Sequence, residues 1–294
     1  MHGYRLTGRG KFILTMLVIL SLAGVISLRK FAVESDKNGV YGSYLNSSHL
    51  YEEHEKPDLC QLASSFNAEI NKSSEAYGGV FEAKEDFLSI NAEEIKTYNQ
   101  SKVVFLTFDD GPSENVTPAI LDVLDEYEIK ATFFVLGNMC EKNPDVLKDV
   151  YTRGHSIGNH SYTHNFKKLY KDEESFLNEL TMTEDVIKQN LGDEYVPRLF
   201  RFPGGSFEDY KQEYMDVLDE KGYVSVDWNA VTGDAEVVSP TYDGTLERMK
   251  ATVKGKSNVV LLMHDSATKH ETVEALPAVI EYLKSQEYEF AIIK

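Results

Sequence analysis

The chain has 294 residues, of which 42% are hydrophobic and 27% charged, and its formal net charge at pH 7 is −18. This length accommodates one large α/β domain of about 200 to 250 residues together with a further segment. The acidic balance excludes duplex nucleic acid bound through a basic patch, because a surface of this sign repels phosphate groups.

The first 30 residues differ from the rest in charge and hydropathy. They contain five basic residues and no acidic one, and residues 12–28 are an uninterrupted run of 17 uncharged residues. Such a run is at the short end of what spans a bilayer as a helix. Its basic flanks favour an uncleaved anchor with a cytoplasmic N-terminus, and a cleaved signal peptide is the alternative. We therefore expect residues 1–30 to attach the chain to the cell membrane as a single-pass protein with its catalytic domain extracellular, or the chain to be secreted if this segment is cleaved.

Residues 31–100 are rich in Ser, Asn, Glu, Lys and Tyr and contain only short apolar runs. This composition predicts a stalk or accessory region, although a short packed module stays open. The chain has two cysteines, Cys60 in this region and Cys140 further on, so one disulfide is an open alternative. Since no Cys-x-x-Cys spacing occurs, any metal site must use histidine and carboxylate ligands.

From residue 101 to residue 294 short apolar segments alternate with longer amphipathic ones. The expected strands include VVFLTF, ATFFVLG, HSIGNHS, RLFRF, YVSVDW, NVVLLMH and EFAIIK, each separated from the next by a helix-like segment. Strands alternating with helices of about ten or more residues predict βαβ units and a mainly parallel sheet. We expect an α/β fold, a distorted and incomplete (β/α) barrel of about seven parallel strands, preceded by the transmembrane helix and stalk.

The residues suited to chemistry lie at the ends of these expected strands. In an α/β barrel the carboxyl ends of the strands converge on one face, so residues far apart in sequence can meet there. The side chains in question are Asp109, Asp110, His160, His164, Arg201, Trp228 and His264.

Two of these local patterns suit a metal ion. Asp109 and Asp110 repel one another unless a cation neutralises one of them, and a bound metal would leave the other free as a base. His160 and His164 are four residues apart and would lie on one side of a helical turn, able to bind one ion. Taken alone, each pattern is explained better by a solvated turn or by structural histidines. The nearby His155 is expected to be a packed strand residue.

TFDDGP at residues 107–112, followed by GHSIGNHSYTH at 154–164, closely resembles the first two motifs of carbohydrate esterase family 4, the polysaccharide deacetylases. Three further blocks follow in the family's order: RFPGG at 201–205, Trp228 with Asp234 six residues later, and LMHD at 262–265. The resemblance covers about residues 101–294. Five ordered motifs are far more specific than any one of them, so they favour a site over the structural alternatives.

The resemblance implies a role for each matching residue. Asp110, His160 and His164 would bind one divalent metal ion, zinc first, with cobalt, manganese, nickel and iron(II) as alternatives. Asp109 would be the base that deprotonates a water held at the metal, and Arg201 would orient Asp109. Further roles fall to the Gly204 amide as oxyanion donor, His264 as general acid held by Asp234, and Leu262 and Trp228 as walls of the acetyl pocket.

Two positions depart from the family pattern. Gly204 stands where an aromatic residue commonly follows the proline, and Ala235 stands where an aromatic commonly follows the aspartate. We expect both changes to open the substrate groove without touching the metal, the acid or the base. They put the identity of the glycan in doubt more than the reaction.

The expected function is hydrolytic removal of N-acetyl groups from N-acetylglucosamine units of an extracellular polysaccharide. Peptidoglycan is the first candidate partner, with chitin-like polymers and exopolysaccharides as others, and the membrane is a partner through the N-terminal helix. One alternative is removal of O-acetyl groups from xylan or an exopolysaccharide. A second alternative, from another class, is a membrane-tethered protein that binds glycans without turning them over.

Overall fold

The structure, a computed structural model, describes residues 87–237 and 240–294. The expected anchor, most of the stalk region and Cys60 lie outside these residues, so the predictions made for them stay predictions. Within the described residues no helix combines the length and apolar character needed to cross a membrane. Cys140 is completely buried in the core, and burial raises the pKa of its thiol.

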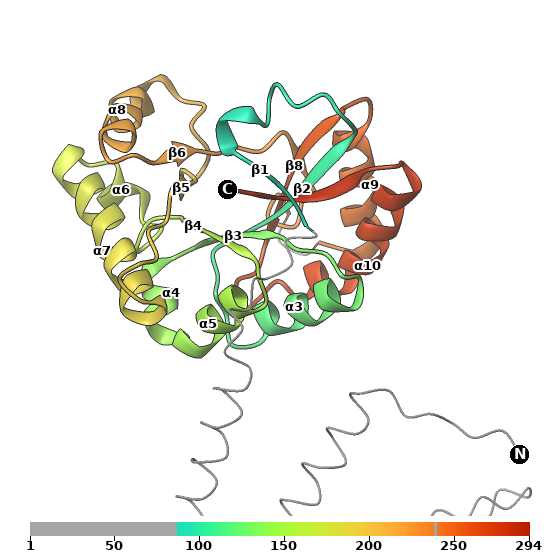
Figure 1. Cartoon of the computed structure of the whole chain (residues 1–294), viewed down its shortest axis with the longest axis horizontal. Helices are drawn as coiled ribbons and strands as arrows, with labels where there is room; N and C mark the ends of the chain where they lie inside the picture. Colours follow the sequence, from blue (N-terminus) through green and yellow to red (C-terminus); the bar gives the residue numbers. More distant parts are fainter. Residues whose placement is uncertain (1–86, 238–239) are drawn as a thin grey trace, which may run out of the picture. The chain divides into compact units, whose positions relative to one another are not determined.

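The described strands form one sheet in which all pairings are parallel (Figure 1). Seven of them follow the order β6-β5-β4-β3-β2-β8-β7, and β9 pairs with both β1 and the start of β2. No pairing among the described residues joins β6 to β7, which confirms a barrel that is incomplete. The strands are β1 (Leu88–Ile90), β2 (Val103–Asp109), β3 (Thr132–Val135), β4 (Ser156–Asn159), β5 (Leu199–Phe200), β6 (Val224–Ser225), β7 (Ala230–Val231), β8 (Asn258–His264) and β9 (Glu289–Ile293).

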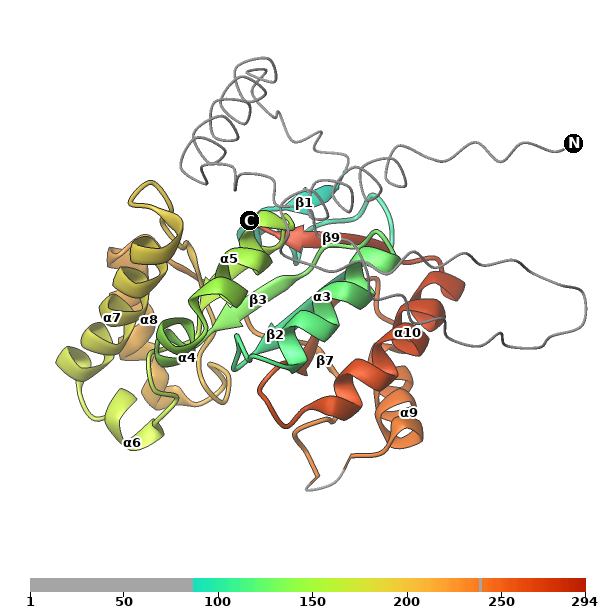
Figure 2. The same ribbon diagram turned by 90° about the horizontal axis from the view of Figure 1, so that it is seen from below.

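Helices cover the outside of this sheet. Figure 2 shows α3 beside α10 and α7 beside α8, and α10 also contacts α9. The α-helices are α3 (Val116–Glu126), α4 (Gly137–Lys142), α5 (Pro144–Thr152), α6 (Phe166–Leu169), α7 (Glu173–Leu191), α8 (Gln212–Glu220), α9 (Tyr242–Val253) and α10 (His270–Ser285). Two 3₁₀ turns, η1 (Ala92–Glu94) and η2 (Asp209–Lys211), complete the described elements.

The local sequence explains why α7 begins and ends where it does. The Asp172 side chain caps the helix by accepting a hydrogen bond from the Ser175 amide, and Glu173 and Glu174 complement the positive end of the helix dipole. The helix stops at Gly192, whose φ of 102° suits glycine and few other residues. α7 is therefore fixed at both ends, which matters because it supports one of the site loops.

The packed domain begins earlier than the expected boundary at residue 101. β1 pairs with β9 in register from Leu88 to Ile90, and Ile90 and Ile95 are buried in a core cluster with residues of β2 and β9. The short apolar run at residues 88–90 carries too little sequence signal to mark a strand by itself. It becomes one because β9 offers an edge on which it can pair.

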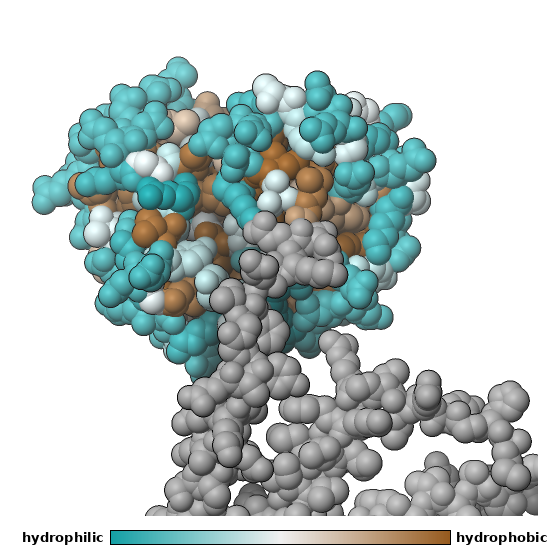
Figure 3. Space-filling view, in the orientation of Figure 1, coloured by the Kyte–Doolittle hydropathy of each residue, from teal (hydrophilic) through white to brown (hydrophobic). Residues whose placement is uncertain are grey.

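Alternation along β2 and β8 separates the core from the site. Val104, Leu106 and Phe108 point toward the helices and join the larger core cluster, whereas Val103 and Phe105 point into the barrel. The same period of two carries Thr107 and Asp109 into the barrel interior. Figure 3 shows the surface of the domain in the orientation of Figure 1. Hydrophilic residues predominate around the rim of the face in view, and apolar residues gather toward its middle.

Candidate active site

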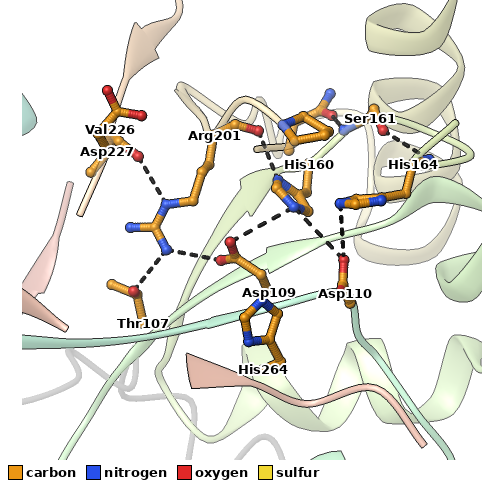
Figure 4. A network of polar contacts seen from close by, with 12 residues as sticks. Thr107, Asp109, Asp110, His160, Ser161, His164, Arg201, Val226, Asp227 and His264 are labelled. Atoms are coloured by element: carbon orange, nitrogen blue, oxygen red, sulfur yellow. Dashed lines mark hydrogen bonds and ion pairs between the residues drawn. The ribbon is translucent and has the colours of Figure 1, made fainter. Parts of the chain in front are cut away.

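The carboxyl end of the barrel brings together the expected residues Asp109, Asp110, His160, His164, Arg201 and His264 (Figure 4). Asp109 at the end of β2 is the direct register partner of His264 at the end of β8. His160 and His164 follow β4, and Arg201 follows β5, two neighbouring positions in the same sheet. Strand order therefore brings together groups that are as much as 155 positions apart in the chain.

Asp110, His160 and His164 form a candidate metal centre. Ligand atoms from the three side chains all lie within 4.8 Å of one another. Asp110 Oδ1 is 3.7 Å from His160 Nε2 and 3.5 Å from His164 Nε2. This oxygen is buried and accepts no hydrogen bond from the described residues. A buried carboxylate oxygen without a donor, facing two imidazoles, fits a divalent cation, because such an ion would supply the missing charge.

The hydrogen bonding of His160 prepares it to be a ligand. Its Nδ1 lies 2.7 Å from the backbone carbonyl oxygen of Arg201, and because a carbonyl can only accept, Nδ1 carries the hydrogen. Nε2 then presents its lone pair to Asp110 and the centre of the site. Burial lowers the pKa of His160 to about 3, so the ring is neutral at physiological pH, as a metal ligand must be.

The spacing of the two histidines suggested a helical turn, but the structure has no helix there. They belong to a loop after β4 in which Ser161 and His164 have positive φ values of 76° and 56°. The buried carboxylate of Glu179 on α7 accepts hydrogen bonds from the Tyr162 and Thr163 amides, at 3.1 and 2.7 Å. These bonds hold a strained backbone that turns both imidazoles toward one point.

Asp109 is buried beside Arg201, which is itself fully buried rather than part of a surface ion pair. Arg201 Nη1 donates to Asp109 Oδ1 at 2.9 Å and to Thr107 Oγ1 at 2.7 Å, and Nε donates to the Val226 carbonyl. Burial raises the pKa of Asp109, and the positive charge of Arg201 opposes this effect. Arg201 therefore fixes one carboxylate oxygen of Asp109 and leaves the other, Oδ2, near His160.

His264 is paired with Asp234 through the ring and the backbone. Asp234 Oδ1 lies 2.9 Å from His264 Nδ1, while Oδ2 accepts from the His264 amide and from Thr272 Oγ1. Burial disfavours the charged ring, but the hydrogen bond and charge of Asp234, with Asp109 and Asp110 nearby, raise the pKa of His264 to about 9. The imidazolium is therefore the stable form at neutral pH, with its Nε2 free to donate.

The peptide between Pro203 and Gly204 is fixed from its carbonyl side. Tyr170 Oη donates to the Pro203 carbonyl oxygen at 2.8 Å, and Lys211 Nζ donates to it at 3.2 Å and also to the Gly205 carbonyl. In a trans peptide the N–H points away from the C=O. The Gly204 N–H accordingly has no acceptor among the described residues, and Gly204 lines the pocket that holds the metal-site residues.

This pocket has a volume of about 470 Å³, and every expected site residue except Arg201 lines it, together with a few others. Leu262 and Trp228 both form part of its wall, and Trp228 also packs against a core cluster. The groove beside Gly204 is not the open gap that the sequence suggested. A Cβ on Gly204 would lie 2.9 Å from Cε1 of Phe166, because the Phe166 ring lies against this backbone.

Comparison with known proteins places this geometry in a family. The sequence profile of the polysaccharide deacetylases matches residues 96–226. A peptidoglycan-N-acetylglucosamine deacetylase of Bacillus cereus is 34% identical over 201 residues, which cover 67% of this chain and 68% of that protein. This chain belongs to the polysaccharide deacetylase family, carbohydrate esterase family 4. Motif order and overall sequence agree on this assignment.

Other family members differ in what they do. The solved structure of a CE4 esterase of Streptococcus mutans is 34% identical, with a TM-score of 0.66 over 71% of this chain and 93% of that one. A CE4 pseudoenzyme of Bacillus anthracis is 28% identical, with a TM-score of 0.57 over 66% of this chain and 65% of that one. Membership in the deacetylase family therefore does not by itself establish turnover.

Several supporting residues were not anticipated from the sequence. Asp265 is fully buried, accepts from Thr117 Oγ1 at 2.6 Å and packs so closely on Gly111 that a side chain at Gly111 would overlap it. Its place directly after His264 in LMHD was an available signal. Glu179 in α7 and Lys211 in the 3₁₀ turn η2 carried no such signal, because acidic and basic side chains are usually exposed. His155 is buried, as expected, and its Nδ1 accepts from the Ala131 amide rather than facing the metal centre.

Proposed function

We propose that this protein hydrolyses N-acetyl groups from N-acetylglucosamine units of an extracellular polysaccharide, peptidoglycan first. The observation that carries the proposal is the Asp110, His160 and His164 centre lying beside a buried base candidate, Asp109, and a charged acid candidate, His264. The named relatives support the substrate class, since one of them is called a peptidoglycan-N-acetylglucosamine deacetylase.

Asp110, His160 and His164 would hold a divalent metal ion. When bound, such an ion supplies Lewis-acid chemistry, polarising a carbonyl and making water more acidic. Asp109 accepts the proton of the attacking water, and the raised pKa of its carboxyl makes it a stronger base. Arg201 keeps Asp109 in one orientation throughout, through the bond to Oδ1.

The oxygen of the water forms a bond to the acetamide carbon, and the carbonyl oxygen becomes an oxyanion. The N–H of Gly204, a residue that lines this pocket, donates to that oxyanion. Collapse of the tetrahedral species breaks the C–N bond, and His264 transfers its proton to the departing amine. The products are acetate and a glucosamine unit, and Asp234 stabilises the imidazolium until the proton leaves.

The proposed substrate location follows from the N-terminus. The apolar run at residues 12–28 with its basic flanks would hold the catalytic domain outside the cell, at the wall polymer. The acidic charge of the chain does not oppose this, because the N-acetylglucosamine units themselves are uncharged. Peptidoglycan is therefore a substrate within reach of the site.

Acetate release tests the proposal directly. The full chain, recovered from membranes and loaded with zinc, is expected to release acetate from peptidoglycan and from N-acetylglucosamine oligomers. A chelator should abolish release, and added divalent metal should restore it. Acetylxylan in a parallel assay separates the O-acetyl esterase alternative. Metal-independent release, or no release from any acetylated glycan, would overturn the proposed function, and binding without release would favour the glycan-binding alternative.

The buried ammonium of Lys211 supplies a second prediction. Lys211→Met keeps the side-chain length but removes a donor to the Pro203 carbonyl, so the Gly204 N–H is held less firmly and polarised less. We expect kcat to fall about tenfold to a hundredfold. This loss is smaller than that caused by complete removal of an oxyanion donor, which lowers kcat by about 10²- to 10³-fold. KM and metal content should change little. Lys221→Met, at the exposed end of α8, is the matched control. A rise in KM with unchanged kcat would contradict this role.

A further inference from the structure

Aromatic rings border the glycine pair of the RFPGG segment. The Phe166 ring, at the start of α6, lies against Gly204 and is 44% exposed. Phe207 is 63% exposed and packs edge to face on Trp228, with ring centroids 5.4 Å apart. A Cβ on Gly205 would overlap Phe207 and lie 3.1 Å from Trp228. Both glycines therefore leave room for aromatic rings that lie outside the RFPGG segment.

The orientation of the Phe166 ring is fixed by its neighbours. It makes T-shaped contacts with His164 and Tyr170, with centroids 5.5 and 5.7 Å apart, and Lys211 Nζ lies 6.0 Å from its centroid. Phe166 also lines the same pocket as His164 and Gly204. An exposed aromatic ring held by its neighbours beside a cleft is typical of a binding surface rather than of a core.

We propose that Phe166 is a sugar-binding platform, stacking on the hexosamine unit next to the one that loses its acetyl group. The inference rests on the proposed function for the site and deepens it: the substrate would be a glycan chain of at least two linked units. The apolar C–H face of a pyranose ring suits a phenyl face, while the hydroxyl groups remain in water. Phe207 with Trp228 would form the second aromatic rim of the same groove.

The position of the Phe166 ring also explains why the sequence lacks an aromatic residue at position 204. The ring of Phe166 already occupies the space that a side chain there would enter, and the Gly204 φ of 78° disfavours any Cβ. The ring beside the cleft therefore comes from the loop that follows the candidate metal-binding histidines and not from the RFPGG segment. This places a substrate contact next to a metal ligand, within one short stretch of chain.

Variants of Phe166 test the platform in the full, zinc-loaded chain. The substrates are N-acetylglucosamine and its β-1,4-linked tetramer, and acetate release gives kcat and KM. For the tetramer we expect Phe166→Ala and Phe166→Leu to raise KM about tenfold, equivalent to about 1.4 kcal/mol, with KM carrying most of the loss in kcat/KM. Phe166→Tyr should retain the affinity of the native protein. The monomer should be affected little by any of the three. Tyr151→Ala, which removes an exposed ring from α5 outside the pocket, is the control.

A second readout does not depend on turnover. Trp228 is the only tryptophan in the chain and lines the pocket, so its fluorescence reports glycan binding. Weaker tetramer binding by Phe166→Leu supports the platform even if no glycan is deacetylated, in which case only the proposed function fails. The platform is overturned if tetramer affinity is unchanged in Phe166→Ala and Phe166→Leu. It is also overturned if monomer and tetramer weaken equally with loss of zinc, since that pattern means Phe166 only supports His164.

Discussion

Asp109→Asn is expected to lower kcat by about 10²- to 10⁴-fold, the range that general-base catalysis contributes. The substitution removes the proton acceptor but keeps an oxygen that can accept the bond from Arg201. Metal binding should persist, because Asp109 is not among the three grouped ligand residues. Initial rates of acetate release measure turnover, zinc content measures metal binding, and Trp228 fluorescence measures glycan affinity.

The pH dependence of the native protein gives an independent check on Asp109. Its pKa is raised by burial, and the base works only when deprotonated, so activity should be lost as pH falls through that pKa. Asp145→Asn is the matched control, because that carboxylate is almost wholly exposed on α5. If Asp109→Asn retained native kcat, another group would have to serve as the base.

His264→Asn is the second large effect, again a loss of about 10²- to 10⁴-fold in kcat, since the departing amine then leaves without a proton. The pKa of His264 is raised to about 9, so the protonated acid persists through neutral pH and is lost as pH rises through about 9. In the pH–rate profile of the native protein, the alkaline limb, where activity falls, should therefore lie near pH 9. This limb should be absent from the profile of the variant. His270→Asn, an exposed histidine on α10, should leave the limb in place.

Asp234→Asn tests whether Asp234 raises the pKa of the general acid His264. Loss of the negative charge beside Nδ1 lets burial dominate, so the pKa of His264 falls and the alkaline limb moves to lower pH. A pH–rate profile of this variant, compared with that of the native protein, measures the displacement. An alkaline limb that stays near pH 9 in Asp234→Asn would mean that a group other than His264 titrates there.

Much of the fold could be predicted from the chain because its patterns are local. Apolar runs such as VVFLTF and NVVLLMH are strands of a parallel sheet wherever helices cover them, and they became β2 and β8. The segment at residues 88–90 could not be recognised, since it is a strand only through β9. Its assignment depends on a partner about 200 positions away, which no local window contains.

The candidate site divides in the same way. The ordered motifs pointed to Asp110, His160 and His164, which the structure groups as a candidate metal centre, and to the pairing of Asp234 with His264, because each group occupies a fixed place beside a strand end. Sequence spacing was wrong about the histidine loop. A four-residue interval suggests a helical turn, yet Ser161 and His164 have left-handed backbone, and the loop donates hydrogen bonds to Glu179.

Only the tertiary structure decided what surrounds the candidate metal centre: Lys211 donates to the Pro203 carbonyl of the Gly204 peptide, and the Phe166 ring lies against Gly204. The sequence by itself determined the type of fold and the chemical groups, because periodicity and motif order are properties of the chain. The orientation of those groups and the shape of the groove arise from contacts between distant segments, and those contacts exist only once the strands have paired.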